Sequence, residues 1–430
     1  MAKKKDLTPE EKIQQALVPK EEQPYPLPEG WKWVRLGDIT KIVGGGTPSS
    51  SVKEYYEDGD IAWISPSDLS NYSEKYISYG AKNITKLGLE KSSAQLMPKG
   101  TVLLSSRAPI GYVVIAKIAL STNQGFKNFL PSLSYLPDYL YWYLKGNTEI
   151  LKRYASGTTF LELSAKKASL IKFPLAPIEE QKRLVQIIEK YFYRLDKIQE
   201  ILESVPSSVE KRKAAIFHKA FTGELTVKWR EEHNVLKSSW KKKILGDVLK
   251  PMLSKKPEGV TFRYIDIDSI DNKRQEVKEP KVILTSKAPS RASRQVDEGD
   301  IIFSMVRPYL KNIALIDSLL ADCIVSTGFY VCKCKDLIYS KYLYYLLCSD
   351  DAINYFMQFM KGDNSPSIRK DEFLTLPIFI PELIEQKKIV DVLESFLKKE
   401  EVIFRKTQEM LKLIKLTRQS ILSKAFRGEM

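Results

Sequence analysis

One stretch of sequence occurs twice in this chain, and this repeat constrains the fold more than any other feature. Five short blocks recur in the same order, each roughly 200 residues further along the chain. They are WKWVRLGDI and WKKKILGDV, GTVLLSSRAP and GDIIFSMVRP, YLYWYL and YLYYLL, PIEEQKRLVQIIE and PELIEQKKIVDVLE, and AIFHKAFTGEL and SILSKAFRGEM. A shared order at a shared spacing indicates two copies of one structural unit.

Each copy changes character once along its length. Residues 27–177 and 227–381 contain short apolar runs broken by Gly, Pro, Asn and Ser, which is typical of strands and turns, together with one helical segment. Residues 178–226 and 382–430 instead repeat apolar side chains at spacings of three and four, as helices do when they pack lengthwise on a partner. The sequence therefore predicts an α+β protein: an N-terminal segment (residues 1–26) and two similar mixed globules, separated by two long coiled-coil helices.

The two helices should pack through their apolar seams. The residues predicted to form these seams are Ile188, Tyr191, Leu195, Ile198, Leu202 and Val205 in the first helix, and Ile389, Leu393, Phe396, Ile403, Met410 and Ile414 in the second. Pro206 predicts a kink or break, and the Gly of each Lys-Ala-Phe-x-Gly-Glu sequence predicts a stop. If the helices run antiparallel, a pseudo-twofold axis relates the two globules.

The amino-acid composition reduces the number of function classes that fit this chain but does not select one of them. The chain has 68 Lys and Arg against 53 Asp and Glu, and this net charge of +15 suits a polyanionic partner but also fits a merely basic protein. It has only two His, and its four Cys fit buried, reduced thiols better than a zinc site. The start of the chain has no apolar core of a signal peptide, and no run of about eighteen apolar residues occurs. We expect a cytoplasmic protein.

Enzyme motifs are missing from the sequence. It contains no Pro-Pro dipeptide of an amino-methyltransferase motif, no Gly-x-Gly-x-x-Gly fingerprint and no P-loop. Glu180-Gln181-Lys182 and Glu385-Gln386-Lys387 spell half of a nuclease motif, but we interpret both as solvated faces at helix starts. We expect no catalysis, no metal and no cofactor.

Several blocks together resemble a known family. LPEGWKWVRLGDI, GGGTPS, SSRAPIG, FPLAPIEEQK and KAFTGEL are similar to the specificity subunits of type I restriction–modification enzymes, and the resemblance covers essentially the whole chain. It implies two target recognition domains that each read one half of a bipartite DNA site. It also implies helices that set the gap and dock methyltransferase (modification) subunits, two of them by our expectation, with restriction subunits joining through the assembled complex. ALVPKEEQPYPLPEGW resembles the segment by which this family completes a circular, pseudo-symmetric arrangement.

Candidate DNA contacts follow from residue type and loop position. Phosphates are bound by Lys, Arg, hydroxyls and backbone amides, and base edges by small polar side chains and Arg. The candidates are Gly45, Gly46, Thr47, Ser49, Lys53, Ser105, Ser106, Arg107, Thr158 and Thr159 in the first globule, and Arg291, Arg294, Arg307, Ser365, Ser367, Arg369 and Lys370 in the second. The glycines equally suit a tight turn, the paired Arg107 and Arg307 an internal ion pair, and the hydroxyl-rich loops an ordinary connection. A two-headed DNA-binding regulator and a pure scaffold remain alternative functions.

Overall fold

The computed structural model describes residues 9–157, 161–362 and 365–430. The chain divides into two compact units: unit 1 is Met1–Leu202 with Met410–Met430, and unit 2 is Glu203–Glu409. Each unit holds one globule and one half of a helix pair. Among the described residues, none of the helices is long and apolar enough to cross a bilayer.

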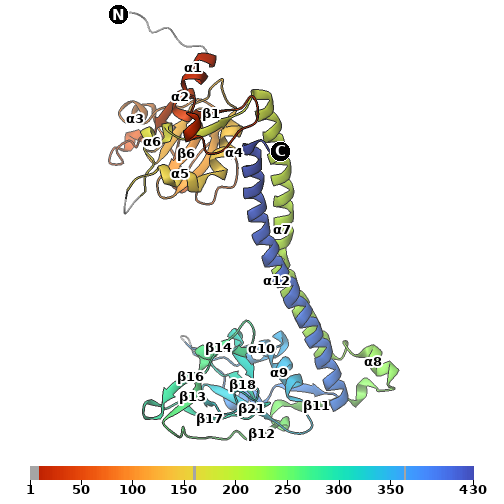
Figure 1. Cartoon of the computed structure of the whole chain (residues 1–430). Coiled ribbons are helices and arrows are strands. Elements are labelled where there is room, and N and C mark those ends of the chain that lie inside the picture. The colour runs from red at the N-terminus through yellow and green to blue at the C-terminus, as the bar shows by residue number, and fades with distance from the viewer. Residues whose placement is uncertain (1–8, 158–160, 363–364) are drawn as a thin grey trace, which may run out of the picture. The chain divides into compact units, whose positions relative to one another are not determined.

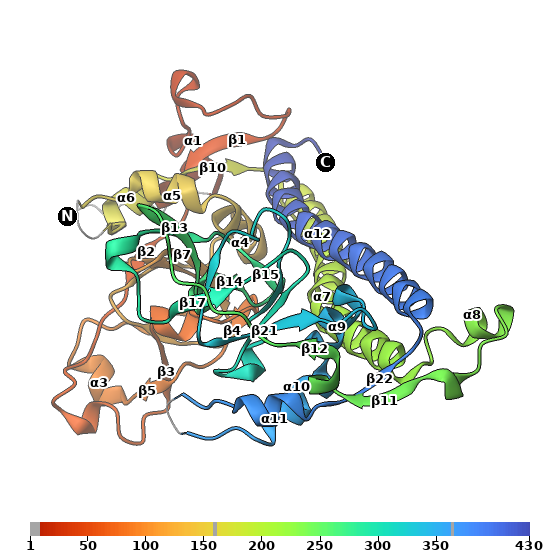
Figure 2. The ribbon, with the colours of Figure 1, turned by 90° about the horizontal axis from the view of Figure 1, so that it is seen from below.

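Unit 1 is built around a five-stranded sheet (Figure 1). The order of that sheet is β2 (Ile42–Gly44), β9 (Phe126–Phe129), β6 (Val102–Ser106), β7 (Ile110–Ala116) and β4 (Tyr76–Ile77). A three-stranded sheet has the order β5 (Lys82–Ile84), β3 (Ile61–Ile64) and β8 (Ser121–Thr122), and β1 (Lys32–Arg35) runs antiparallel beside β10 (Lys172–Leu175) (Figure 2). The helices of the globule are α1 (Pro9–Gln15), α2 (Leu36–Ile39), α3 (Lys86–Glu90), α4 (Pro137–Gly146), α5 (Thr148–Tyr154) and α6 (Ala165–Ser169).

Unit 2 contains two four-stranded sheets (Figure 1). The first has the order β12 (Leu249–Lys250), β21 (Phe329–Cys334), β18 (Ile301–Ser304) and β19 (Ile313–Leu315). The second has the order β16 (Lys281–Leu284), β13 (Thr261–Ile265), β20 (Ile324–Ser326) and β17 (Ala292–Gln295). Two further antiparallel pairs join β11 (Lys241–Ile244) to β22 (Pro377–Ile380) and β14 (Ile270–Asp271) to β15 (Glu276–Val277). The helices of the globule are α8 (Val227–Glu232), α9 (Ser340–Cys348), α10 (Asp350–Met357) and α11 (Lys370–Leu374).

The repeat in the sequence is a repeat in the structure. The central strands β7, β6 and β9 of unit 1 match β19, β18 and β21 of unit 2 in order and in antiparallel pairing. Gly100 and Gly299 both have a positive φ, of 85° and 86°, just before the matching strands β6 and β18. Tyr139 and Tyr342 are both fully buried, and each phenol donates a 2.9 Å hydrogen bond to a backbone carbonyl of the last strand of its globule. The predicted α+β architecture with an internal repeat is confirmed.

Two helices of 45 residues, α7 (Ile178–Thr222) and α12 (Leu383–Arg427), follow the globules. In unit 1, Arg183 of α7 donates to the backbone carbonyl of Met430, whereas Asp196, further along α7, accepts from Arg418, earlier on α12. The residue numbers of the contacting partners rise along α7 while they fall along α12, so the two helices run antiparallel in this unit. The helices end at Gly223 and Gly428, which adopt φ of +84° and +70°, as the sequence predicts.

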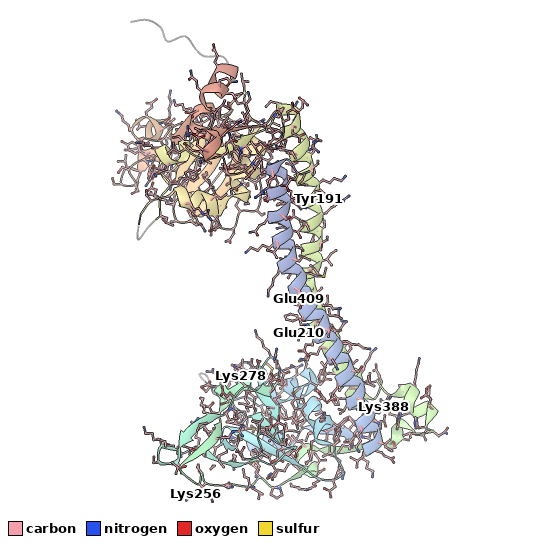
Figure 3. All side chains as sticks on the ribbon, viewed as in Figure 1. Tyr191, Glu210, Lys256, Lys278, Lys388 and Glu409 are labelled. Atoms are coloured by element: carbon pink, nitrogen blue, oxygen red, sulfur yellow. The ribbon has the colours of Figure 1, made fainter. Side chains whose placement is uncertain are left out.

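The buried seam differs from the predicted one by one helical position at several points. In unit 1 the side chains of Tyr191 and Ile198 are 44% and 42% exposed, and Figure 3 shows Tyr191 pointing away from the neighbouring helix. Phe192 and Gln199, one residue further on, are the less exposed side chains. The interpretation of Tyr191 as core packing was wrong. A seam that includes a polar Gln cannot be recognised from hydrophobic spacing alone.

The second helix departs from the predicted seam in the same way. Ile403 and Met410 are 41% and 47% exposed, whereas Glu400 and Thr407 are buried. Arg212 of α7 neutralises Glu400 through two hydrogen bonds of 2.8 and 2.7 Å in unit 2. The polar residues Glu400 and Thr407 therefore belong to the buried seam. The remaining predicted residues Ile188, Leu195, Leu202, Val205, Ile389, Leu393, Phe396 and Ile414 are buried or half-buried.

Pro206 does not break α7, which continues through it to Thr222. A proline ring removes one N–H donor and displaces a preceding carbonyl, which usually interrupts a helix interior. Here the packing of α7 on α12 in unit 2 continues beyond the proline, with Phe217 and Ala220 in the same apolar core as Ile389 and Leu393. Tertiary contacts therefore outweigh the tendency of proline to end a helix. The prediction of a break at Pro206 was wrong.

A buried glutamine fixes each long helix to its own globule. Gln181 and Gln386 are 0% exposed, and in both the side-chain carbonyl accepts from a backbone N–H just before a helix while the amide donates to two backbone carbonyls. The partners are Leu136, Ser134 and Ala176 for Gln181, and Tyr339, Leu337 and Pro381 for Gln386, at 2.7–3.1 Å. The Gln of the repeated Glu-Gln-Lys sequence therefore has a structural role in both units, since it attaches the long helix to the globule.

The environment of the Glu in the Glu-Gln-Lys sequence differs between the two units. Glu180 is part of an exposed pair with Arg183. Glu385 is 1% exposed and accepts from Arg230 at 2.6 Å, Thr226 at 2.6 Å and Trp240 at 2.9 Å. The expectation of a solvated face is wrong for Glu385, because α8 and the residues around it cover the helix start in unit 2.

The N-terminal segment contacts the end of α12 within unit 1. The Tyr25 phenol donates to the carbonyl of Phe426 at 3.1 Å, and the Arg427 guanidinium lies 4.8 Å from the centre of the Tyr25 ring. Burial raises the pKa of Tyr25 to about 12. The beginning and the end of the chain are thus held together in this unit.

Candidate nucleic-acid interface

In unit 1, three segments with candidate residues meet at the turn of residues 123–125, which follows β8. The Gly46 N–H donates to Thr122 O at 2.9 Å, which brings the glycine loop to the turn. The Ser106 N–H donates to Gly125 O at 2.7 Å, which brings the end of β6 and Arg107 to it. The Leu163 N–H then donates to Ser106 O at 2.9 Å, which adds the segment of residues 161–164 before α6, the late loop of unit 1. We call this assembly the first recognition surface.

Unit 2 builds the corresponding surface on the corresponding strands. The Thr327 N–H donates to Arg291 O at 2.8 Å, and the Met305 N–H donates to Gly328 O at 2.9 Å. The late loop of unit 2, residues 365–369 before α11, is added when the Ile368 N–H donates to Met305 O at 3.0 Å and the Arg307 N–H donates to Pro366 O at 2.8 Å. We call this assembly the second recognition surface. Arg107 and Arg307 each lie in the turn after a strand, beside the late loop of their own unit. The strand registers place Val306 where unit 1 has Arg107, so Arg307 matches Ala108, with which it shares a positive φ. The two arginines are therefore offset by one position in the turn.

The central turn of both surfaces was missed by sequence reasoning. It is a sixth repeated block, Ser-Thr-Asn-Gln-Gly-Phe at residues 121–126 and Ser-Thr-Gly-Phe at residues 326–329. Gln124 and Thr327 are exposed on it, and the side chains of Gln124 and Thr47 are hydrogen-bonded to each other. The two extra residues of the first turn make the two surfaces different at their centres. An exposed Gln can pair with an adenine edge in the major groove.

Charged groups gather on the first recognition surface. Arg107 has a side chain 39% exposed, and its guanidinium lies 3.9 Å from a carboxylate oxygen of Glu162. Lys127, on β9, is buried, and its ammonium donates to Ser106 Oγ at 3.1 Å and lies 3.8 Å from the other Glu162 oxygen. Burial lowers the pKa of Lys127, and Glu162 partly offsets that effect. Lys127 and Glu162 carried no signal in the sequence, because only the fold brings them to Arg107.

The second recognition surface carries different side chains at the positions that match Lys127 and Glu162. Tyr330 stands where unit 1 has Lys127, and Ser367 stands where it has Glu162, as the matching strand registers show. Burial raises the pKa of Tyr330 to about 12, and the nearby Arg294 partly lowers it. Arg294 is half-buried in β17, and its Nε is buried with no hydrogen-bond partner in the part of the chain that the structure describes. Arg307 adopts φ of 49°.

Three predicted contacts are internal instead of accessible. Ser105 and Ser106 are 0% exposed: Ser105 Oγ donates to Pro109 O at 2.7 Å, and Ser106 Oγ donates to Gly125 O at 3.0 Å. They hold the turn that presents Arg107. Gly46 is buried, and both its backbone groups are engaged, the carbonyl accepting from Trp63 Nε1 at 2.9 Å. These three residues do not offer their polar groups to DNA.

Close packing explains the glycine loop. A Cβ on Gly45 would lie 1.8 Å from Asn123 O, and one on Gly46 would lie 2.2 Å from Ala94 N. Because no side chain fits there, glycine lets the loop run against the central turn. The tight-turn alternative is thus closer to the structure than the phosphate cradle.

The other candidate residues lie at the surface of their units. Those with exposed side chains are Thr47, Ser49, Lys53, Arg291, Ser365, Arg369 and Lys370, and Ser367 is half-buried. Thr158 and Thr159 lie outside the described residues. Arg369 and Lys370 begin α11, where the Arg369 N–H donates to Glu372 at 2.8 Å.

Residues that could bind a metal are dispersed in the described part of the chain, and most of the thiols are buried. No cluster of three or more His, Cys, Asp or Glu suited to a metal occurs in residues 9–157, 161–362 and 365–430. The four cysteines are free thiols, of which Cys323, Cys332 and Cys348 are buried, and burial raises their pKa. This confirms the prediction of reduced thiols packed in the core.

The two matching units define a protein made of a duplicated domain, and comparison with known proteins identifies that domain. A family model described as "Type I restriction modification DNA specificity domain" matches residues 28–207 and again residues 237–412. The chain therefore belongs to the family of type I restriction–modification specificity proteins, and the resemblance expected from its sequence is confirmed.

Individual relatives agree with this family. The chain is 40% identical over 230 residues to the type I restriction enzyme MjaIX specificity subunit of Methanocaldococcus jannaschii, a match covering 52% of each chain. It is 22% identical over 429 residues to the EcoKI specificity subunit of Escherichia coli K12, covering 94% of this chain and 90% of that one. The chain thus spans about half the length of MjaIX in the more similar match, and most of EcoKI in the more distant one.

Two solved structures share the fold. The HsdS subunit from Thermoanaerobacter tengcongensis superposes with a TM-score of 0.64 at 19% identity, covering 95% of this chain and all of that one. A chain from a study of assembly and conformational transition of the type I R-M system superposes with a TM-score of 0.70 at 20% identity, again over 95% of this chain and all of that one. At these identities the likeness concerns the fold.

Proposed function

We propose that this chain is the DNA sequence-recognition subunit of a type I restriction–modification complex, in which each globule reads one half of a bipartite site. The observation that carries the proposal is the double match to a DNA specificity domain. It is supported by two surfaces built on the same strands with different side chains. Different side chains at matching places imply two different half-site sequences.

The domain roles follow from this proposal. Residues 27–177 form target recognition domain 1 and residues 227–381 target recognition domain 2, with helical spacers at 178–226 and 382–430. Each domain would bind phosphates through its Lys and Arg side chains and read base edges from the central turn, joined in the second domain by Arg307. The net charge of +15 favours association with DNA and makes it dependent on salt.

Partners supply the chemistry in this proposal. The subunit has no catalytic site of its own and needs no cofactor; two modification subunits dock on the helices and methylate the DNA, and restriction subunits join through the assembled complex. Its partners and its DNA substrate place it in the cytoplasm. The exposed apolar side chains of the helices, which include Tyr193, Ile201, Leu413 and Leu416 in unit 1 at 60–66%, are available for such docking.

Mapping methylation in a host genome tests the proposal directly. The chain is co-expressed with the modification subunit of its own system, and methylated adenines are located by long-read sequencing. We expect a single split motif with two different halves and a constant gap. A stable complex that methylates no defined motif would contradict the proposal and favour a scaffold, and tight specific binding by the chain without partners would favour a stand-alone regulator.

The spacer role has a separate test. Lengthening one helix at exposed positions should alter the preferred gap between the two half-sites while leaving each half-site sequence unchanged. The preferred gap is read from the same methylation map. A gap that stays constant would show that the helices do not set it.

A further inference from the structure

Lys127 of unit 1 is a charged side chain in a place where a neutral one would be expected. It projects from β9, an inner strand of the five-stranded sheet, and is 7% exposed. Burying an ammonium removes most of its hydration, so it requires compensation by acceptors or an anion nearby. Its hydrogen bonds go to neutral oxygens, Ser106 Oγ at 3.1 Å and Phe126 O at 3.4 Å. The nearest carboxylate is Glu162.

Glu162 lies between two cations without closing on either. One of its oxygens is 3.8 Å from the Lys127 ammonium and the other 3.9 Å from the Arg107 guanidinium. Both separations exceed the roughly 2.7–3.2 Å of a formed N–H···O hydrogen bond. The side chain of Glu162 is 45% exposed, so water competes for the same carboxylate. The single carboxylate of Glu162 therefore only partly compensates the charges of Lys127 and Arg107.

The backbone around Glu162 is nevertheless well held. Its N–H donates to Ser156 O at 3.0 Å, and its carbonyl accepts from the Ser156 N–H at 3.1 Å. The next residue, Leu163, is fully buried and bonded to Ser106. Rotation of the Glu162 side chain can therefore move the carboxylate away from the cations while its backbone stays in place.

We propose that Arg107 and Lys127 form a binding site for one DNA backbone phosphate, and that Glu162 occupies this site in the free protein as a built-in competing anion. The inference rests on the proposed DNA-reading function. A phosphate carries the same single charge as the carboxylate it replaces and offers more acceptor oxygens to two donors that converge from β9 and the β6–β7 turn. Exchange of one anion for the other keeps Lys127 compensated throughout binding.

The exchange has a consequence for the strength of DNA binding. A surface whose cations are already covered by an internal carboxylate attracts arbitrary DNA less strongly than one with free cations, because non-specific binding depends on neutralised phosphates. Glu162 thus lowers binding to any sequence, and cognate contacts elsewhere on the surface compensate for its displacement. Unit 2, with Tyr330 and Ser367 at the matching places, does not contain this arrangement.

The test replaces Glu162 by Gln in the complete complex with its modification subunits. Binding of a fluorescent cognate duplex and of a scrambled duplex is measured by anisotropy between about 50 and 200 mM salt. We expect Glu162→Gln to bind both duplexes roughly fivefold more tightly, with a salt slope steeper by about one. The matched control is Glu149→Gln, which removes one charge from an exposed pair with Lys152 in the same unit and should change affinity less than twofold.

A second variant keeps the test decisive if general electrostatics contribute. In a Lys127→Met background, whose folding is checked by thermal unfolding, the gain from Glu162→Gln should fall to that of the control. Equal gains from Glu162→Gln and Glu149→Gln, or an undiminished gain beside Lys127→Met, would overturn the inference. In either case a wild-type complex that still prefers the cognate duplex leaves the proposed function standing, whereas the absence of that preference would refute the function itself.

Discussion

The two recognition surfaces use one framework for two kinds of chemistry. In both, a strand end carrying Arg lies against a Ser-Thr-containing turn and a late loop through the same backbone hydrogen bonds. In unit 1 the framework presents Arg107, Lys127 and Glu162, and in unit 2 it presents Arg307, Tyr330 and Ser367. A framework made of backbone contacts tolerates such exchanges, which is what two half-sites of different sequence require.

The largest difference between the units concerns the first residue of the Glu-Gln-Lys sequence. Glu385→Ala should lower the free energy of unfolding by about 3–5 kcal/mol, because it leaves Arg230 buried without its counter-charge. Glu180→Ala, which removes an exposed pair, should lower it by about 0–1 kcal/mol. Chemical denaturation of both variants measures the contrast. Equal effects would mean that the buried network of unit 2 contributes nothing special.

The second residue of that sequence should behave alike in both units. Gln181→Leu and Gln386→Leu each leave one N–H and two carbonyls, one of them buried, without their side-chain partner, so each should cost about 2–3 kcal/mol of stability. Gln186→Leu, an exposed position on the same helix, is the control and should change stability by less than about 0.5 kcal/mol. Unequal losses at Gln181 and Gln386 would break the symmetry of the two copies.

The paired arginines should separate the two chemistries. Arg307→Ala is expected to weaken cognate binding by about 1–3 kcal/mol and to relax the sequence preference at one position of its half-site, as loss of a guanine contact does. Arg107→Ala should weaken binding to cognate and scrambled duplexes alike and reduce the salt slope by about one, as loss of a phosphate contact does. Competition binding and methylation mapping with the assembled complex distinguish them. Two folded variants with unchanged affinity would remove both residues from the interface.

The smallest expected effect concerns the polar seam of the helix pair in unit 2. The hydrogen bonds from Arg212 hold the pKa of Glu400 below its usual value of 4.5. A lowered carboxyl pKa means that the pair stabilises the folded state above pH 4.5 and loses this contribution as the pH falls below it. Unfolding curves of the wild type and Glu400→Gln should therefore differ at neutral pH and converge in acid. Glu401→Gln, at an exposed neighbouring position, should show no such convergence.

Much of the fold was predictable because the sequence contains two copies of one structural unit. Repeated blocks located both globules, both long helices and their glycine stops, since hydrophobic spacing and glycine caps act locally. The exact seam was not predictable. Gln199, Glu400 and Thr407 lie on its inner side although Tyr191, Ile198, Ile403 and Met410 look better suited. Tertiary pairing, such as that of Glu400 with Arg212, decides this where hydrophobicity alone would choose wrongly.

The sequence by itself determined that this protein is a duplicated α+β chain of the type I specificity family, and it pointed to Arg107 and Arg307 as the strand-end arginines of the two globules. Only the tertiary structure decided which candidates are accessible. It buried Ser105, Ser106 and Gly46, and it brought Lys127 and Glu162 to Arg107 from separate parts of the chain. The physical reason is that burial and electrostatic partnership depend on which strands become neighbours, and residue type and spacing do not record that.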